Sequence, residues 1–291
     1  MAPDPRGATW AGDTVRLDRV LPELGLVRSR SRATELIAEG NALVNGVVAT
    51  KAGAKVTAGD HVSVRGEDHY VGRAAHKLLA ALDTFGIDPD GRIALDLGAS
   101  TGGFTQVLLE RGAATVLAID VGHDQLAQRL RDDPRVRLVE GRNARDLTPE
   151  NLAADTGVRD QPALVVADLS FISLRLVFAA IAACAAEHAD VVLLIKPQFE
   201  VGRVKDGVVT SPAQWADAMR IVLRAAADHG FAARGLASSP VIGATGNREF
   251  LGHFVRAVDA GPTEWESRIA ELTGSPDATL HGDPARAEEA R

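Results

Sequence analysis

A lysine at the end of an apolar run is the first residue whose type and position suggest chemistry. Lys196 follows five apolar residues in "DVVLLIKPQFEVG", and such a run is typical of a short strand buried on both faces. An unpartnered buried ammonium is costly, so this side chain either reaches water or serves a function. The chain has five lysines against 27 arginines. An amine can titrate where a guanidinium cannot, so the lysine is consistent with such a role.

Three other charged residues could share a site with Lys196. Asp168 ends the strand "ALVVADLS", Glu249 begins the strand "REFLGHFVRAV", and Lys77 lies in the amphipathic helix "RAAHKLLAALDTFGI". The carboxyl ends of parallel strands meet at one edge of a sheet, where ligands bind. Charged groups gathered in this way can act as a base or orient the lone pair of a reacting atom. The sequence leaves open which of these Lys196 would be.

A glycine-rich turn, "LDLGASTGGF", follows the first strand of the same region. Gly98, Gly102 and Gly103 allow backbone to approach a ligand, and Asp96 places a carboxylate just before the turn. Dinucleotide enzymes share such loops, but a pyrophosphate is better served without an added negative charge. A second acid, Asp120 in "LAIDVG", ends the next strand 24 residues later. The two acids favour a cofactor other than a dinucleotide.

The elements that must position these residues alternate between strand and helix from about residue 77 onwards. This alternation predicts an α/β fold with a mostly parallel seven-stranded sheet covered by helices on both faces. The preceding segment is different: "RLDRVLPELGL" and "RATELIAEG" predict two short helices, and Asn45-Gly46 predicts a β-hairpin. We therefore expect a small α+β domain before the larger one.

Charge and composition limit the function classes. Residues 14–65 carry eight basic and five acidic side chains, although the whole chain has a net charge of −7, so this head favours a polyanionic partner. The single cysteine, Cys184, excludes an internal disulfide framework and a cysteine-cluster zinc site. The N-terminus lacks a signal-peptide pattern, and the longest apolar run is shorter than the ~20 residues that cross a bilayer. We expect a cytoplasmic protein without membrane or metal partners.

The head resembles the RNA-binding domain named after the small-subunit ribosomal protein S-four. In that family, arginines around the turn between the two helices contact RNA phosphates, because a guanidinium can donate two parallel hydrogen bonds. A solvated charged face is the alternative. The resemblance implies that the RNA-binding residues are Arg16, Arg19, Arg28, Arg30 and Arg32.

The larger region resembles S-adenosylmethionine-dependent methyltransferases, which implies a Rossmann-like fold. In that class an acid near Asp96 serves the methionine end of the cofactor, and an acid at the place of Asp120 binds the ribose hydroxyls. Asn143 in "VEGRNARDL" is a weaker candidate for the adenine pocket and could equally be a turn residue. The expected cofactor-binding residues are Asp96, Gly98, Ser100, Gly102, Gly103, Phe104, Asp120, Asn143 and Asp168.

The residues after the fourth strand narrow the atom that would be methylated. Enzymes that methylate amino groups usually carry Asn/Asp-Pro-Pro-aromatic there, but this chain reads "ADLSF". Enzymes that methylate pyrimidine carbons need a cysteine nucleophile, whereas Cys184 lies in an apolar segment and looks like packing. A hydroxyl acceptor fits better. The set Lys77, Asp168, Lys196 and Glu249 is similar, in chain order, to the tetrad of RrmJ/FtsJ-type RNA ribose 2'-O-methyltransferases.

Head and body together resemble the TlyA family, also known as hemolysin A, across nearly the whole chain. The resemblance implies S-adenosyl-L-methionine-dependent 2'-O-methylation of cytidines in 16S and/or 23S ribosomal RNA, on free RNA or on ribosomal subunits, and we expect a monomer. Lys196 is the candidate base, Asp168 would orient its amine and the cofactor, and Lys77 and Glu249 would position the ribose. A membrane-active cytolysin and a non-catalytic RNA-binding protein are the alternatives.

These patterns divide the chain into five segments. We expect an N-terminal extension (1–13), the RNA-binding domain (14–65), a linker with the start of the catalytic domain (66–76), the methyltransferase domain (77–262) and a polar C-terminal tail (263–291).

Overall fold

The computed structural model describes residues 6–27, 29–65, 69–202, 204–243, 245–257 and 265–274. The chain forms two compact units, Met1–Val71 and Gly72–Arg291, which are described separately.

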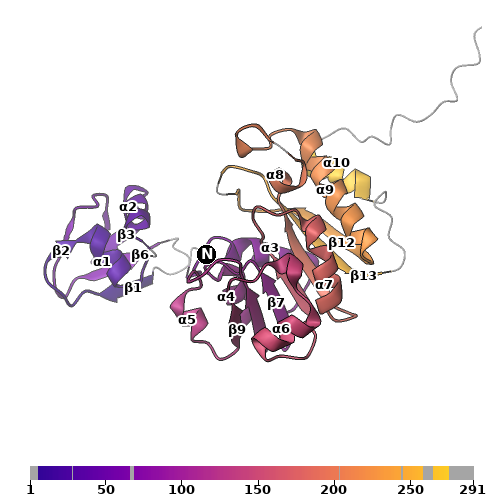
Figure 1. The fold of residues 1–291 in the computed structure, drawn as a ribbon. Coiled ribbons are helices and arrows are strands. Elements are labelled where there is room, and N and C mark those ends of the chain that lie inside the picture. The colour runs from indigo at the N-terminus through magenta and orange to yellow at the C-terminus, as the bar shows by residue number, and fades with distance from the viewer. Residues whose placement is uncertain are drawn as a thin grey trace, which may run out of the picture. The chain divides into compact units, whose positions relative to one another are not determined.

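The first unit is a small α+β domain (Figure 1). Its antiparallel sheet has the order β1-β6-β3-β4. Strands β2 and β5 form a separate, two-stranded antiparallel sheet. Asn45 and Gly46 have φ of 51° and 80° between β3 and β4, the left-handed pair that a tight hairpin requires. The elements are β1 (Arg6–Thr9), β2 (Val15–Arg16), α1 (Leu17–Glu23), α2 (Arg30–Ala38), β3 (Ala42–Val44), β4 (Val47–Ala49), β5 (Lys55–Val56) and β6 (His61–Val64).

Apolar residues at helical spacing form the core of this unit. Leu17, Val20 and Leu21 of α1 are fully buried and belong to one cluster with Leu36 and Ile37 of α2. Strand β1 lies within residues 1–13, which the sequence analysis assigned to an N-terminal extension. It pairs with β6, so the sheet of the first unit begins before position 14.

The second unit is built on a seven-stranded sheet of order β12-β13-β11-β10-β7-β8-β9. The central strands pair in parallel, whereas β13 is antiparallel to both of its neighbours. Strand order reverses between β7 and β10, which is where open α/β sheets bind ligands. The strands are β7 (Ile93–Leu97), β8 (Thr115–Ile119), β9 (Val136–Val139), β10 (Leu164–Ala167), β11 (Asp190–Ile195), β12 (Phe231–Ser238) and β13 (Phe250–Arg256).

Helices cover both faces of this sheet (Figure 1). Helices α3 and α4 pack on each other and on one face, whereas α6, α7 and α9 belong to the other, with α10 against α9. The helices are α3 (Ala75–Phe85), α4 (Gly103–Glu110), α5 (Gln128–Arg131), α6 (Pro149–Thr156), α7 (Phe178–Cys184), α8 (Pro197–Glu200), α9 (Pro212–Asp228) and α10 (Glu266–Thr273), with 3-10 turns η1 (Ala144–Asp146), η2 (Leu174–Leu176) and η3 (Lys205–Gly207).

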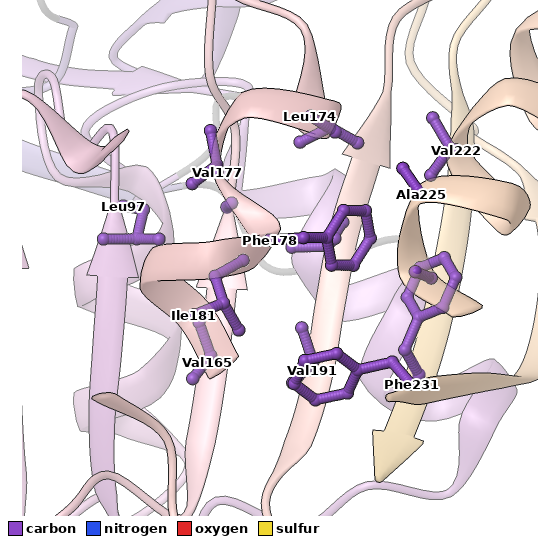
Figure 2. Close-up of a cluster of buried hydrophobic side chains, with 14 of the residues drawn as sticks. Leu97, Val165, Leu174, Val177, Phe178, Ile181, Val191, Val222, Ala225 and Phe231 are labelled. Atoms are coloured by element: carbon purple, nitrogen blue, oxygen red, sulfur yellow. The ribbon is translucent and has the colours of Figure 1, made fainter. Parts of the chain in front are cut away.

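The main core lies between the sheet and the α7/α9 layer. Figure 2 shows Phe178 and Ile181 of α7 over the strands, with Val222 and Ala225 of α9 nearby. Phe178 is fully buried, and its ring meets that of Phe231 at a centroid distance of 6.1 Å. Truncating such a side chain to alanine typically costs about 3–5 kcal/mol of stability. This core fixes the strands whose ends carry the site.

Two elements differ from the sequence-based expectation. The pattern "HDQLAQRL" predicts a helix from residue 123, but α5 covers only Gln128–Arg131. Asp124 has a φ of 54° and its N–H donates to Glu140, so the chain makes local contacts there instead of a helical turn. Helix α10 lies inside the expected polar tail and buries Ile269.

Candidate active site

Lys77, Asp168, Lys196 and Glu249 come together in the second unit. Lys196 Nζ lies 2.6 Å from Asp168 Oδ1, and Lys77 Nζ lies 3.3 Å from Asp168 Oδ2 and 2.7 Å from Glu249 Oε2. Asp168 therefore links the two lysines, and Lys77 links the two carboxylates. The four residues form a continuous ion-paired cluster, which we call the tetrad.

Sheet topology explains how residues so far apart in sequence meet. Asp168 directly follows β10 and Lys196 directly follows β11, and these parallel strands end at the same edge of the sheet. Glu249 precedes β13, which runs in the opposite direction, and Ile195 pairs with Phe250. The start of β13 consequently lies beside the end of β11, while Lys77 is contributed by α3, which packs against β13.

Burial makes the tetrad an unusual arrangement of charge. Lys77, Lys196 and Glu249 have relative exposures of 6%, 7% and 4%, and the Asp168 side chain is 13% exposed. Buried charges persist when each is paired, since removing one partner leaves the other uncompensated. Lys196 also donates to Ser170 Oγ at 2.9 Å. The formal charges of the two lysines and the two carboxylates thus cancel, and the ion pairs offset the free-energy cost of burying them.

Two adjoining cavities open beside the tetrad. The larger, of about 600 Å³, is lined from the ends of β7, β8, β9 and β10, and the smaller, of about 160 Å³, includes Lys196. The two share four lining residues: Gly98, Ser100, Asp168 and Ser170. Asp168 therefore faces a space of ligand size and touches the tetrad lysines at the same time.

The glycine turn after β7 is shaped by contact with the end of β10. Gly98 has a φ of 85°, and a Cβ there would lie 2.9 Å from the carbonyl oxygen of Asp168. Any side chain at this position would both strain the backbone and displace Asp168. Gly102 also has a left-handed φ, of 99°, where the turn enters α4. The turn therefore approaches the end of β10 closely, whereas its approach to a ligand stays a prediction.

Asp120 is held at the wall of the larger cavity by backbone donors. Its Oδ2 accepts from the N–H of Ser100 at 2.7 Å and its Oδ1 from the N–H of Gly122 at 2.7 Å. Asn143 lines the same cavity and also caps η1, accepting from the N–H of Arg145. It is both a turn residue and a wall residue, so the two alternatives from the sequence are compatible.

Asp96 is placed differently from the other candidates. It is fully buried in β7, does not line either cavity, and accepts from the Thr105 hydroxyl of α4 at 2.6 Å through Oδ2. Its Oδ1 has no hydrogen-bond partner among the described residues. Burial raises the pKa of Asp96 to about 7, and the charges of Asp168 and Asp120 act in the same direction. Of the remaining candidates, Gly103 and Phe104 line the smaller cavity and Gly102 lines neither.

Phe171, which no sequence pattern identified, lies at the rim of the larger cavity. Its relative exposure is 92% and its φ is 64°, a left-handed conformation that is rare for an aromatic residue. Strained, exposed aromatic side chains at a cavity mouth are a functional signal. The sequence offered only its position three residues after "AD" at the end of a strand, so only the backbone conformation identifies it.

The first unit carries the arginines expected to contact RNA. Arg16 and Arg30 both bind the buried carboxylate of Asp18, at 3.0 and 2.9 Å, while their own side chains are about half exposed. The hydrogen bond from Arg16, followed by that from Arg30, holds the pKa of Asp18 below its usual value. Arg19 is exposed on α1, and Arg32 is ion-paired with Glu35. Arg28 lies outside the described residues.

The sheet order, the glycine turn and the cavity at the switch point define a Rossmann-like methyltransferase. The FtsJ-like methyltransferase family model matches residues 70–256, and the S4 domain model matches residues 15–62. The chain combines these two parts and belongs to the TlyA family. No helix among the described residues has the length and apolar character needed to span a bilayer.

Relatives share most of the chain. It is 47% identical over 241 residues to the 16S/23S rRNA (cytidine-2'-O)-methyltransferase TlyA of Mycobacterium tuberculosis, covering 81% of this chain and 88% of the relative. It is 38% identical to Hemolysin A of Brachyspira hyodysenteriae, covering 83% of this chain and all of the relative. A solved structure from Streptococcus thermophilus, described as a hemolysin, has a TM-score of 0.69 at 35% identity and covers 91% of this chain and 98% of that one.

Proposed function

We propose that this protein transfers a methyl group from S-adenosyl-L-methionine to the 2'-hydroxyl of cytidine in 16S and/or 23S ribosomal RNA. The observation that carries the proposal is the convergence of Lys77, Asp168, Lys196 and Glu249 beside a cavity of about 600 Å³. The curated relative from Mycobacterium tuberculosis, named for this activity, supports the choice of nucleotide and RNA. Ribosomal RNA as substrate implies a cytoplasmic protein.

The residues around the larger cavity fit the proposed cofactor. Asp120 presents a carboxylate suited to ribose hydroxyls, and Asn143 lies on the wall expected for the adenine. The side-chain-free approach at Gly98 suits the polar methionine end, whereas Asp96 is fully buried and lines neither cavity. S-adenosylmethionine supplies a methyl group on a positively charged sulfur, which is electrophilic without a metal.

The tetrad would prepare the acceptor hydroxyl. Asp168 lies 2.6 Å from the Lys196 amine and positions it. Lys196 would either accept the hydroxyl proton as a neutral amine, after losing a proton to solvent, or, as the ammonium, donate a hydrogen bond that fixes the direction of the oxygen lone pair. The new bond would join the 2'-oxygen to the methyl carbon while the sulfur–methyl bond breaks, so that the neutral thioether S-adenosylhomocysteine is the leaving group. The hydroxyl proton would leave through Lys196 or directly to solvent. Lys77 and Glu249, ion-paired to each other at 2.7 Å, would bind the ribose and keep the charge balanced.

Phe171 would receive the base of the acceptor nucleotide. Enzymes that act on a nucleotide inside structured RNA must separate it from its neighbours, and an exposed aromatic ring offers a stacking surface. Its position, three residues after Asp168, puts the ring next to the loop that carries the tetrad carboxylate. This assigns the base side of the site to the loop after β10.

The first unit would supply general affinity for RNA. Arg16 and Arg30 keep about half of their side-chain surface exposed while sharing the carboxylate of Asp18, which restricts their positions. Guanidinium groups so held can bind phosphates with less loss of side-chain entropy. Arg19, Arg28 and Arg32 complete the proposed RNA-binding set.

The direct test incubates the purified full-length protein with ribosomal subunits, or with free ribosomal RNA, and methyl-labelled S-adenosylmethionine. Digestion of the RNA to nucleosides should place the label on the ribose of cytidine. Label on a base, or no label in any ribosomal particle or RNA, would contradict the proposal. Lysis of erythrocytes or vesicles by the same preparation without methyl transfer would favour the cytolysin alternative.

A further inference from the structure

Two loops carry the acceptor side of the site, and both lie at the same edge of the sheet. The first runs from Asp168 through Phe171 to η2, and the second is Lys196 with the short helix α8 (Pro197–Glu200). Lys196 contacts Asp168 and Ser170 across the gap between them. The rings of Phe171 and Phe199 form another contact, with centroids 5.4 Å apart.

A buried glutamate makes the most specific link between these loops. Glu200, the last residue of α8, is 4% exposed and accepts two hydrogen bonds from the first loop. Its Oε2 accepts from the Ser173 hydroxyl at 2.5 Å and its Oε1 accepts from the Leu174 N–H at 2.9 Å. Both carboxylate oxygens are thus used to hold residues 173–174, just beyond the exposed ring of Phe171.

The environment of Glu200 shows that the contact is kept at a cost. Burial raises the pKa of Glu200, while the bonds from Ser173 and Leu174 and the charge of Arg175 oppose that rise. Arg175 donates to Ser173 Oγ at 3.2 Å, so the guanidinium, the hydroxyl and the carboxylate form a chain. Glu200 does not line either cavity, so it does not contact the ligands of the proposed reaction.

Resting on the proposed function, we infer that Glu200 is a positioning residue: it clamps the loop after β10 to α8 and thereby fixes Phe171 as a base-stacking surface beside Lys196. Phe171 has an unfavourable left-handed backbone, and such a conformation persists only when the surroundings determine it. The two hydrogen bonds of Glu200 supply that constraint two to three residues further along the chain. Glu200 acts through Phe171 and not on the reacting atoms.

The first measurement is hydrogen exchange of the loop, which needs no activity. In Glu200→Ala the amides of residues 170–176 should exchange at least about tenfold faster than in the wild type, because the acceptor of the Leu174 N–H is lost. Amides of the main sheet should be unchanged. Equal protection of the loop in both proteins would overturn the inference, whatever RNA the enzyme methylates.

The second measurement separates positioning from loss of stability. We expect Glu200→Ala to lower kcat/KM for the RNA by about 10–50-fold while the Kd for S-adenosylmethionine stays within about twofold. Glu200→Gln keeps a carbonyl acceptor for Leu174 and an amide that can bond Ser173, so it should recover most of the loss. Ser173→Ala removes one of the two bonds and should give a smaller decrease.

A double-mutant cycle identifies the route of the effect. If Glu200 acts by placing Phe171, then Glu200→Ala should change kcat/KM by less than about twofold in a Phe171→Ala background. Full additivity of the two changes would overturn the inference. Wild-type protein that labels no RNA would refute the proposed function, and the exchange result would still decide whether the clamp exists.

A matched control comes from the opposite end of the same strand. Asp190 is the first residue of β11, and Lys196 directly follows the last. Arg92 and His253 contact the Asp190 carboxylate at 2.6 and 2.8 Å. Asp190→Ala should reduce the free energy of unfolding without changing kcat/KM for RNA or loop exchange. A similar kinetic loss in this variant would mean that instability alone explains the Glu200 result.

Discussion

Lys196 Nζ and Asp168 Oδ1 lie 2.6 Å apart at the ends of two neighbouring parallel strands. The residue proposed to act on the acceptor hydroxyl is therefore held by a residue that also lines the larger cavity. One carboxylate therefore connects the proposed cofactor side of the site with the proposed acceptor side. Changes at either residue should affect methyl transfer more than they affect the fold.

Removing the amine of Lys196 should abolish most of the activity. General acid–base groups contribute about 10²–10⁴-fold, so Lys196→Ala should lower kcat by at least about 100-fold while cofactor affinity is kept. Lys196→Arg should not restore the rate, because a guanidinium does not titrate near neutral pH. Single-turnover methyl transfer and calorimetric cofactor binding check both statements. A rate above a tenth of the wild-type value in the arginine variant would point to an orienting role.

The buried carboxyl of Asp96 should make stability depend on pH. Its pKa is about 7 in the folded chain against 3.8 for an exposed aspartate, so the folded state holds this proton more tightly. Its contribution to stability is complete below about pH 4, is lost as pH rises towards 7, and is constant above that. The slope from this one group is at most about 1.4 kcal/mol per pH unit.

Asp96→Asn should remove this dependence. Urea unfolding of cofactor-free protein at pH 5, 6, 7 and 8 should show the variant gaining stability relative to the wild type as pH rises. The difference between the two proteins cancels the other titrating groups. Parallel curves for the two proteins would show that Asp96 is ionised in the folded state throughout this range.

Phe171 should separate activity from stability. Stacking of a base on an aromatic ring is worth about 1–3 kcal/mol, so Phe171→Ala should lower kcat/KM for RNA by about 5–150-fold. Phe171→Trp should retain activity, since it keeps an aromatic surface. Because the φ of 64° suits glycine, Phe171→Gly should be about 1 kcal/mol more stable than Phe171→Ala although equally inactive. Thermal unfolding and RNA kinetics of the three variants provide the check.

The arginines of the first unit should govern salt dependence and not chemistry. Arg16→Ala or Arg30→Ala should each weaken RNA binding and reduce the slope of log K against log salt concentration by about 0.7–0.9. Each single variant leaves the other arginine on Asp18, so the buried carboxylate stays paired. The rate at saturating RNA should not change. Arg159→Ala, at an exposed position of the second unit, is the control and should leave the slope unaltered.

Local signals in the sequence predict the fold class and place Asp168 and Lys196 at one edge of the sheet, whereas Lys77 and Glu249 were grouped with them through the family resemblance. Buried strands read as apolar runs, so a charged residue directly after one, such as Lys196 or Asp168, is conspicuous. The seven-stranded, mostly parallel sheet is confirmed. The roles of the individual site residues stay predictions.

Other features depend on contacts that no local pattern reveals. The hydrogen bonds of Glu200 join residues 26 and 27 positions away, and nothing in "KPQFEVG" distinguishes it from a solvated glutamate. Likewise, no local pattern in "ADLSF" predicts the left-handed backbone of Phe171. Helix α10 was not predicted because the C-terminal segment is polar on average. Its few apolar residues, such as Ile269, nevertheless pack against the core of the second unit.

The reversed direction of β13 has a consequence for how this enzyme could diversify. Glu249 reaches the site only because the strand it precedes runs against its neighbours, so Glu249, Lys196 and Asp168 all belong to one half of the sheet. The turn at Gly98 and the carboxylate of Asp120 belong to the other half. Apart from Lys77, which precedes β7, and Asp168, which lines both cavities, the residues proposed for the acceptor and for the methyl donor therefore lie in separate stretches of the chain. Selection for a new acceptor could act on the second stretch while leaving the first intact.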